Sequence, residues 1–214
     1  MEYIKEREEF MKIVGKILEY KLTVGTWGNL SMKVENDKFL ITPSAMEYED
    51  MKGEDLVVMD LKGNIISGKK PSTEKFLHME IYKSRKDVGG ILHIHAVYSG
   101  VFSVVGIPIP PLTEDMAQGI GGDVEVTDYV PPGTKGLALE VVRRLKDKQA
   151  AIIRNHGLVT VGDTLKEAFK VATLVERGAE IFILSHLIGE PKILSHEEVK
   201  KLREFYKNRY IKRR

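Results

Sequence analysis

Cysteine is absent from the 214-residue chain. Structural zinc sites are usually closed and rich in thiolate ligands, so this absence excludes that kind of site. Long hydrophobic runs are also missing, because no apolar segment approaches the ~20 residues of a membrane-spanning helix. The first residues are largely charged, whereas a secretory signal needs an apolar segment. We therefore expect a soluble, cytoplasmic protein with no membrane partner.

An excess of charge of one sign is missing as well. Lysine and arginine number 33 against 31 acidic residues, for a formal net charge of +2, so we expect no nucleic-acid partner. The basic stretch at residues 207–214 continues an amphipathic helical pattern, and basic residues suit a helix C-terminus electrostatically. Linkers rich in serine, glycine or proline are absent too, which predicts a single domain over residues 1–214.

The periodicity of apolar residues predicts helices that alternate with short strands. Helices are expected at residues 2–20, 72–85, 137–145, 164–187 and from 195 onward, and strands at 30–34, 38–42, 56–60, 64–67, 89–96 and 150–156. Residues 106–133 are rich in proline and glycine and are expected to form a loop. This order predicts a layered α/β architecture with a mixed sheet.

Histidines carry the strongest chemical signal in the chain. His93 and His95 are separated by one residue in an apolar segment, and alternate residues of a strand point to the same face. His156 ends the second apolar segment. Three imidazoles with an open fourth position are typical of a catalytic zinc site. Each histidine taken alone could instead be a hydrogen-bonded core residue.

The other histidines give no such signal. His78, His186 and His196 lie in helical patterns, where a structural or solvated role is expected.

Turns that carry hydroxyl groups occur at residues 25–31, 42–45 and 71–74. Glycines and hydroxyls suit a loop that binds an anion, and the last turn opens a helix whose N-terminus favours a phosphate. No P-loop ending of glycine, lysine and serine or threonine is present, so nucleotide hydrolysis is not supported. Glu74 lies in the first helical turn, where it is either a common helix-start carboxylate or a general base beside a metal.

These segments together resemble the class II aldolase and sugar-phosphate epimerase family. The motifs run in order from about residue 5 to residue 185: Gly25-Thr-x-Gly-Asn-x-Ser31, Ile41-Thr-Pro-Ser44, Ser72-Thr-Glu74 followed by Leu77-His78 and Tyr82, His93-x-His95, and Asn155-His156-Gly157. The resemblance implies a zinc enzyme with a three-layer α/β/α fold around a mixed, mostly antiparallel sheet. It also implies a homotetramer whose active sites lie between subunits.

The resemblance also assigns roles to single positions. It implies that His93, His95 and His156 bind one Zn²⁺ per subunit, with Glu74 as a further ligand and as the catalytic acid or base. The phosphate ligands would be Gly28, Asn29, Ser44, Ala45, Ser72 and Thr73. Asp115 stands where aldolases of the family place a proton-donating tyrosine. Tyr206 or Tyr210 could supply a phenol from a neighbouring subunit.

The implied reaction is the cleavage of a sugar phosphate. A ketose 1-phosphate such as L-fuculose 1-phosphate would give dihydroxyacetone phosphate and a small aldehyde such as L-lactaldehyde, through an enediolate that zinc stabilises. A pentulose-phosphate 4-epimerase and a methylthioribulose-1-phosphate dehydratase are alternatives, although the epimerases carry aspartate at the position of Glu74. A catalytically inactive scaffold, like the adducin head domains, is an alternative of another class, but such a scaffold is expected to lose the ligand histidines.

Overall fold

One mixed sheet organises the chain. The computed structural model describes the backbone of residues 2–211 and the side chains of residues 2–209. Eight strands lie in the order β4-β3-β2-β1-β5-β8-β7-β6. All neighbours are antiparallel except β6 and β7, which are parallel. The strands are β1 (Asn29–Lys33), β2 (Lys38–Ile41), β3 (Val57–Asp60), β4 (Ile65–Ser67), β5 (Gly90–Ile94), β6 (Glu125–Val126), β7 (Ala150–Ile153) and β8 (Gly157–Gly162).

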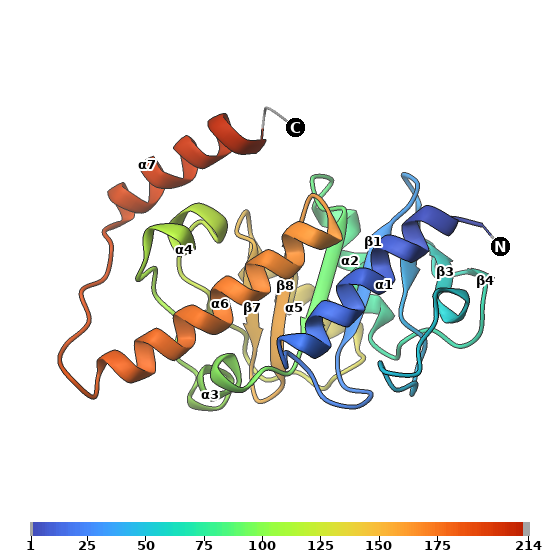
Figure 1. Cartoon of the computed structure of the whole chain (residues 1–214), viewed down its shortest axis with the longest axis horizontal. Helices are drawn as coiled ribbons and strands as arrows, with labels where there is room; N and C mark the ends of the chain where they lie inside the picture. The colour runs from blue at the N-terminus through green and yellow to red at the C-terminus, as the bar shows by residue number, and fades with distance from the viewer. Residues whose placement is uncertain (1, 212–214) are drawn as a thin grey trace.

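Helices cover both faces of this sheet (Figure 1). One face packs against α1 (Ile4–Glu19), α3 (Val97–Val105) and α6 (Leu165–Ser185), and the other against α2 (Lys75–Ser84) and α5 (Lys135–Leu145). Neighbouring residues of β5 show the division, because Leu92 belongs to the first core and Ile91 to the second. The alternation follows from the pleat of a strand. The predicted three-layer α/β/α fold with a mostly antiparallel sheet is therefore confirmed.

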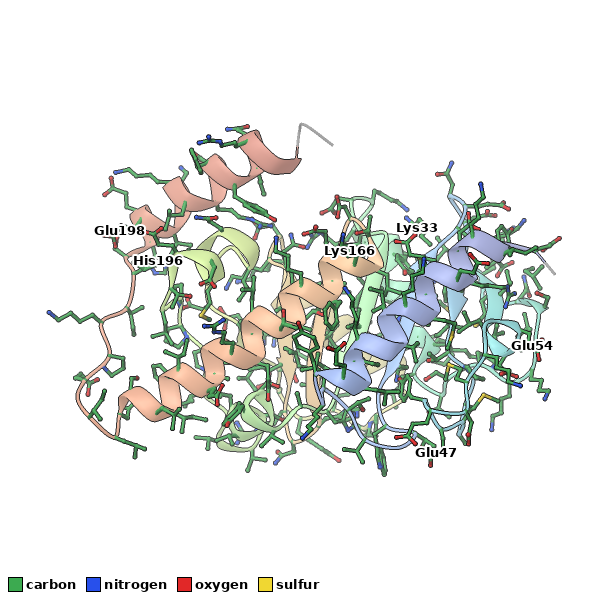
Figure 2. All side chains as sticks on the ribbon, in the orientation of Figure 1. Lys33, Glu47, Glu54, Lys166, His196 and Glu198 are labelled. Carbon is green, nitrogen blue, oxygen red and sulfur yellow. The ribbon has the colours of Figure 1, made fainter. Side chains whose placement is uncertain are left out.

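The segment between the last two helices leads away from the sheet. Helix α7 (His196–Tyr206) lies apart from it and contacts α4 (Glu114–Gly119), and Figure 2 shows His196 and Glu198 at the outer edge of the molecule. Arg203 of α7 donates hydrogen bonds to the carbonyl oxygens of Gln118 and Gly119 at the end of α4. None of the helices in the part of the chain described here is long and apolar enough to cross a membrane.

The expected loop at residues 106–133 is wrong in part. Helix α4 and the short strand β6 form within it, and α3 occupies a segment to which the sequence analysis assigned no element. Short 3₁₀ and π segments occur at Gly53–Asp55 and Lys207–Ile211. The other predicted helices and strands are present with bounds shifted by a few residues.

Candidate metal and substrate site

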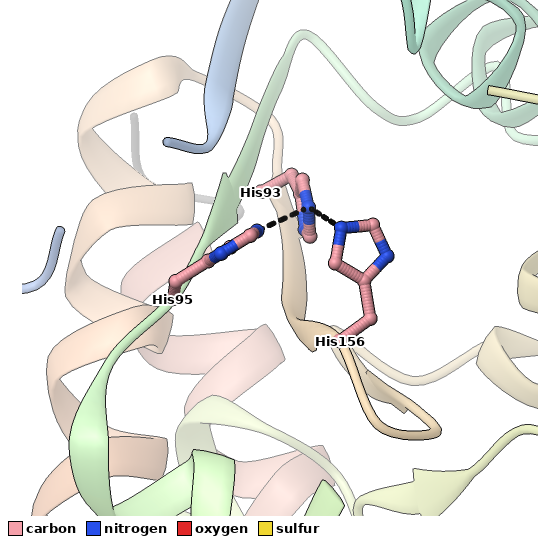
Figure 3. Close-up of side chains that lie close together, drawn as sticks. All are labelled: His93, His95 and His156. Atoms are coloured by element: carbon pink, nitrogen blue, oxygen red, sulfur yellow. Dashed lines mark hydrogen bonds between the residues drawn. The ribbon is translucent and has the colours of Figure 1, made fainter. Parts of the chain in front are cut away.

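Three histidines come together at one end of the central strands. His93 is the fourth residue of β5, and His95 follows directly after that strand. His156 lies in the turn between β7 and β8, so the expectation that a strand ends on this residue is wrong. The Nε2 atom of His93 lies 3.1 Å from Nε2 of His95 and 3.3 Å from Nε2 of His156. Figure 3 shows the three rings converging.

The contact of His93 with the carbonyl oxygen of Leu158 shows which ring nitrogen carries a hydrogen. Its Nδ1 atom lies 3.1 Å from the carbonyl oxygen of Leu158, and a carbonyl can only accept a hydrogen bond. Nδ1 therefore carries a hydrogen, and Nε2 is the ring nitrogen that faces the cluster. Burial lowers the pKa of His95 to about 3 and lowers the pKa of His156 as well. Neutral imidazoles of this kind are metal ligands at physiological pH.

Glu74 completes the cluster from the other side. It is the N-cap residue of α2, and its Oε2 atom lies 3.1 Å from Nε2 of His93. Its Oε1 atom lies 3.8 Å from Nε2 of His156, is buried, and has no hydrogen-bond partner among residues 2–211. Burial acts to raise the pKa of Glu74, but His93, His156 and a hydrogen bond from Asn29 hold this pKa well below its usual range.

The residues fit a tetrahedral metal ion. Ligand atoms at the zinc–nitrogen distance of 2.0–2.1 Å lie about 3.3–3.4 Å apart in a tetrahedron. The Nε2 atom of His93 lies 3.1, 3.3 and 3.1 Å from Nε2 of His95, Nε2 of His156 and Oε2 of Glu74, and the ligand nitrogens of the three histidines all lie within 4.8 Å of one another. Three imidazoles beside a buried carboxylate oxygen that has no hydrogen donor among the described residues suit the nitrogen and oxygen ligand set that the family resemblance implied.

The hydroxyl-bearing loops meet beside Glu74. Pro43 and Pro71 form an antiparallel bridge, with the amide of Ser44 donating to Lys70 and the amide of Ser72 donating to Thr42. These bonds place Ser44 beside Lys70 and Ser72 beside Thr42, so the two hydroxyl-bearing turns meet at the bridge. The hydroxyl of Ser72 accepts a hydrogen bond from the amide of Glu74 at 3.2 Å, and this leaves its own hydrogen free to be donated to an anion.

The glycine-rich loop approaches the histidines closely. Gly28 has φ +83°, and a Cβ atom there would lie 2.6 Å from the carbonyl oxygen of His93, so no larger residue fits. Asn29 pairs with His93 between β1 and β5, is 3% exposed, and donates from Nδ2 to Oε2 of Glu74 at 2.8 Å. Trp27 stacks on His95 with a ring separation of 5.9 Å and stays largely exposed. The loop therefore borders the cluster on its solvent side.

Asp115 and Tyr206 lie away from the histidine cluster of this chain. Asp115 is exposed at the start of α4, where it bonds Thr113 and the amide of Met116. It lines a hollow with residues of α6 rather than with the histidines. Tyr206 accepts a hydrogen bond from Lys170 of α6 at 2.9 Å, and the side chain of Tyr210 lies outside the described residues.

The structure adds residues that the sequence analysis did not assign. His78 and Tyr82 of α2 are fully buried and are linked through Ser31 to the polar groups beside Glu74. Glu74, His78 and Tyr82 follow one another at intervals of four residues, a signal that the sequence already contained, since such residues share one helix face. The hydroxyl of Ser103 accepts a hydrogen bond from the backbone amide of His156. No local sequence pattern predicts this contact, because the two residues are 53 positions apart.

Comparison with known proteins places this site in a family. The family model for the "Class II Aldolase and Adducin N-terminal domain" matches residues 8–183. A relative, 5-deoxy-D-ribulose 1-phosphate aldolase of Bacillus thuringiensis, is 36% identical over 92% of this chain and 93% of its own. L-fuculose phosphate aldolase of Methanocaldococcus jannaschii is 35% identical over 86% and 98% of the respective chains.

A solved structure agrees with these sequence matches. That structure, of an L-fuculose 1-phosphate aldolase, superimposes with a TM-score of 0.92 at 34% identity and covers 97% of this chain and 98% of its own. The match therefore includes the sheet, both helical layers and the segments that hold the histidines. The chain belongs to the class II aldolase family and is an enzyme of the aldehyde-lyase class.

Proposed function

We propose that this enzyme cleaves a ketose 1-phosphate, with L-fuculose 1-phosphate as the first candidate, into dihydroxyacetone phosphate and L-lactaldehyde. The observation that carries the proposal is the cluster of three imidazole nitrogens that could hold a metal ion, with a carboxylate oxygen of Glu74 at 3.1 Å from Nε2 of His93. It lies beside hydroxyl-bearing loops suited to a phosphate. The relatives named as aldolases of L-fuculose phosphate and of 5-deoxy-D-ribulose 1-phosphate support a ketose 1-phosphate as the substrate class.

In this proposal His93, His95, His156 and Glu74 hold one Zn²⁺ per subunit. Zinc bound there supplies Lewis acidity, which stabilises the negative charge that develops on the ketose oxygens as the carbon–carbon bond breaks or forms. His93 is fully buried and so excludes water from one side of the cluster, and its contact with Leu158 keeps Nε2 directed inward. The protein thereby keeps the ligand geometry in place before substrate arrives.

Glu74 is the proposed proton carrier. In the aldol direction its carboxylate accepts the proton from the hydroxyl-bearing carbon of dihydroxyacetone phosphate, and that carbon then attacks the aldehyde carbonyl. A donor on the aldehyde side gives a proton to the new hydroxyl oxygen, so the proton count balances. The cleavage reaction is the reverse. The lowered pKa of Glu74 keeps it ionised and ready to act as the base.

The phosphate is proposed to bind where the loops meet. Ser44, Ser72 and Thr73 offer hydroxyl donors, and backbone amides at Gly28 and Ala45 lie in the same loops. The N-terminus of α2 adds a positive dipole end close to these groups. Asn29 contributes to this region through its contact with Glu74.

A homotetramer is proposed as the working form. Val97, Val101, Val104 and Val105 leave an apolar stripe exposed on α3, next to the histidine strand, and such a patch suits contact with another copy of the chain. Sites between subunits would bring Asp115 and a C-terminal tyrosine of a neighbouring copy to the aldehyde side of the substrate. We also propose that the enzyme works in the cytoplasm, where we expect its sugar-phosphate substrate.

A second candidate substrate is 5-deoxy-D-ribulose 1-phosphate, because a relative named for it is 36% identical over 92% of the chain. Cleavage of either sugar yields dihydroxyacetone phosphate, but the aldehyde differs: lactaldehyde from the first and acetaldehyde from the second. Identification of the aldehyde therefore separates the two candidates.

The decisive experiment is an assay of the zinc-loaded protein against a panel of ketose phosphates, with enzyme-coupled detection of dihydroxyacetone phosphate. We expect release from ketose 1-phosphates and loss of release after treatment with a chelator. An epimerase would instead invert a carbon centre without releasing dihydroxyacetone phosphate, and a dehydratase would release water. A scaffold would bind no zinc and turn over no substrate.

A further inference from the structure

A chain of buried polar groups leads from Glu74 into the core between α2 and β1. Glu74, His78 and Tyr82 are spaced four residues apart on α2 and are 7%, 0% and 0% exposed. Asn29 and Ser31 of β1 face the same helix. Buried polar side chains cost free energy unless they are hydrogen-bonded, so the bonding of this row is informative about its role.

The direction of each hydrogen bond in the row follows from the carboxylate. An ionised carboxylate only accepts, so the bond of 2.8 Å from Asn29 to Glu74 comes from Nδ2. Oδ1 of Asn29 then lies 2.6 Å from Nε2 of His78. An amide oxygen can only accept, so Nε2 of His78 carries the hydrogen.

The other ring nitrogen of His78 must then be an acceptor. Burial lowers the pKa of His78 to about 3, so the ring is neutral and Nδ1 keeps a lone pair. The hydroxyl of Ser31 lies 2.6 Å from Nδ1 and donates to it. The hydroxyl of Tyr82, at 2.9 Å, donates in turn to Ser31. All donors in the row therefore point toward Glu74.

We infer that His78 is a positioning residue for Glu74 and acts through the side-chain amide of Asn29. The Nε2–H of His78 allows only one orientation of that amide, with Oδ1 toward His78 and Nδ2 toward the carboxylate. A flipped amide would set an oxygen against the carboxylate and an N–H against an N–H. Oε2 is thereby held, and Oε1, the oxygen without a hydrogen-bond partner, stays directed at the histidine cluster.

The expected effect of His78 on catalysis rests on the proposed function, whereas the arrangement of hydrogen bonds around His78 does not. Groups that orient a metal ligand or catalytic carboxylate from behind typically contribute about 10–100-fold in metal affinity or activity. His78 contacts neither substrate nor the cluster in this arrangement, so its effect should pass through Asn29 and Glu74 alone.

The first test compares two replacements of His78. The amide of glutamine reaches about as far as Nε2, so His78→Gln keeps a donor for Asn29. The shorter asparagine reaches only the Nδ1 position, so His78→Asn loses that donor. We expect His78→Asn to weaken zinc binding, measured by chelator competition, by about 10–100-fold, and to slow solvent exchange of the carbon-bound proton of saturating dihydroxyacetone phosphate by a similar factor. His78→Gln should stay close to wild type in both.

A matched control separates positioning from loss of stability. Ile81 is fully buried on the same helix, in the same core, and is outside the polar row. Ile81→Ala should destabilise the fold yet leave zinc affinity and exchange unchanged well below its melting temperature. Equal losses in Ile81→Ala and His78→Asn, or equal losses in both His78 variants, would overturn the inference in favour of simple packing.

The second test uses the metal-free wild-type protein and needs no substrate. Long-range ¹H–¹⁵N NMR should show His78 as the Nε2–H tautomer at neutral pH, and the Asn29 side-chain amide should exchange slowly with solvent. The Nδ1–H tautomer would refute the inference even if the His78 variants fail to fold. If no ketose phosphate is cleaved, the proposed function fails, whereas the tautomer and the zinc affinities still decide the role of His78.

Discussion

The hydroxyl of Ser103 on α3 accepts a hydrogen bond from the backbone amide of His156 at 2.9 Å and donates to the carbonyl oxygen of Ile153 at 2.7 Å. Ser103 is 2% exposed. A buried hydroxyl thus ties the turn that carries one histidine to a helix that begins just after the other two. The geometry of the cluster depends on this contact between two layers of the fold.

Ser103→Ala should therefore loosen the turn. The amide of His156 also lies 3.1 Å from the carbonyl oxygen of Ile153, so we expect a loss of about 1–2 kcal/mol in the free energy of unfolding. The zinc affinity of Ser103→Ala should also fall, because the turn carries His156. Ser99→Ala is the matched control, since Ser99 is buried on the same helix and its hydroxyl has no partner within residues 2–211. Urea unfolding measures the stability of both variants, and chelator competition measures their zinc affinity. Equal values for Ser103→Ala and Ser99→Ala would refute the role given to Ser103.

Gly157→Ala should disrupt the histidine cluster. A Cβ atom at this position would lie 2.5 Å from the carbonyl oxygen of Ile94, 3.0 Å from His95 and 3.2 Å from His93. The β5–β8 pairing or the histidine rings must then shift, so zinc affinity should fall by at least about tenfold, the loss typical of a disturbed ligand shell. Gly15→Ala in α1 meets nothing within 4 Å and should stabilise the protein by about 0.5–1 kcal/mol. Normal zinc content in Gly157→Ala would contradict the close packing of this turn.

Alanine at His93, His95 or His156 should remove activity and most of the bound zinc while the protein remains folded. Apolar side chains form the cores on both faces of the sheet, and of the three histidines only His93 is fully buried, so we expect the variants to fold. Elemental analysis and circular dichroism of the purified variants check both parts. The exposed His196 on α7 provides the control, because His196→Ala should keep its zinc. Full occupancy in all three cluster variants would rule out the ligand assignment.

Glu74→Gln should separate binding from catalysis. The amide is nearly the same size, so the fold is kept, and the three histidines keep the zinc bound when zinc is supplied in excess, but the amide cannot accept a proton. We expect a dihydroxyacetone phosphate analogue to bind, and the exchange of the carbon-bound proton with deuterated solvent to slow by about 10²–10⁴-fold, as for a lost general base. Exchange at the wild-type rate would leave Glu74 as a helix-start carboxylate and make Asp115 the leading candidate for the base.

The buried His78 should make the metal-free protein sensitive to acid. Its pKa is lowered from 6.5 to about 3 by burial, so below pH 6.5 the unfolded state binds one more proton than the folded state. The stability from this group is complete above pH 6.5 and is lost as the pH falls toward 3, with a slope of about 1.4 kcal/mol per pH unit.

His78→Gln removes this titration. Between pH 7 and pH 5 the variant should lose about 2 kcal/mol less than the wild-type protein in urea unfolding. Ile81→Ala, which changes no titratable group, should be destabilised equally at both pH values. Identical pH slopes for wild type and His78→Gln would show that the imidazole titrates alike in the folded and unfolded chain.

Much of this protein could be predicted from local patterns. The spacing of His93 and His95 in an apolar segment puts both on one side of a strand because side chains alternate there. Glu74 could be placed at a helix start from the turn before it. These predictions needed only neighbours in sequence. Helix α3 was missed because its exposed side carries valines and its buried side carries serines, the reverse of the usual pattern. Helix α4 was missed because its six residues are too few to show a helical period.

The sequence by itself determined the candidate ligand types, the order of most helices and strands, and the chemistry that imidazoles and a carboxylate can perform. Only the tertiary structure decided which atoms of those residues face one another. The tautomer of His93 depends on the carbonyl oxygen of Leu158, 65 residues away, and the orientation of Glu74 depends on Asn29, 45 residues away. Hydrogen bonds across that separation arise from how strands and helices pack, because no local periodicity encodes the identity of a distant partner.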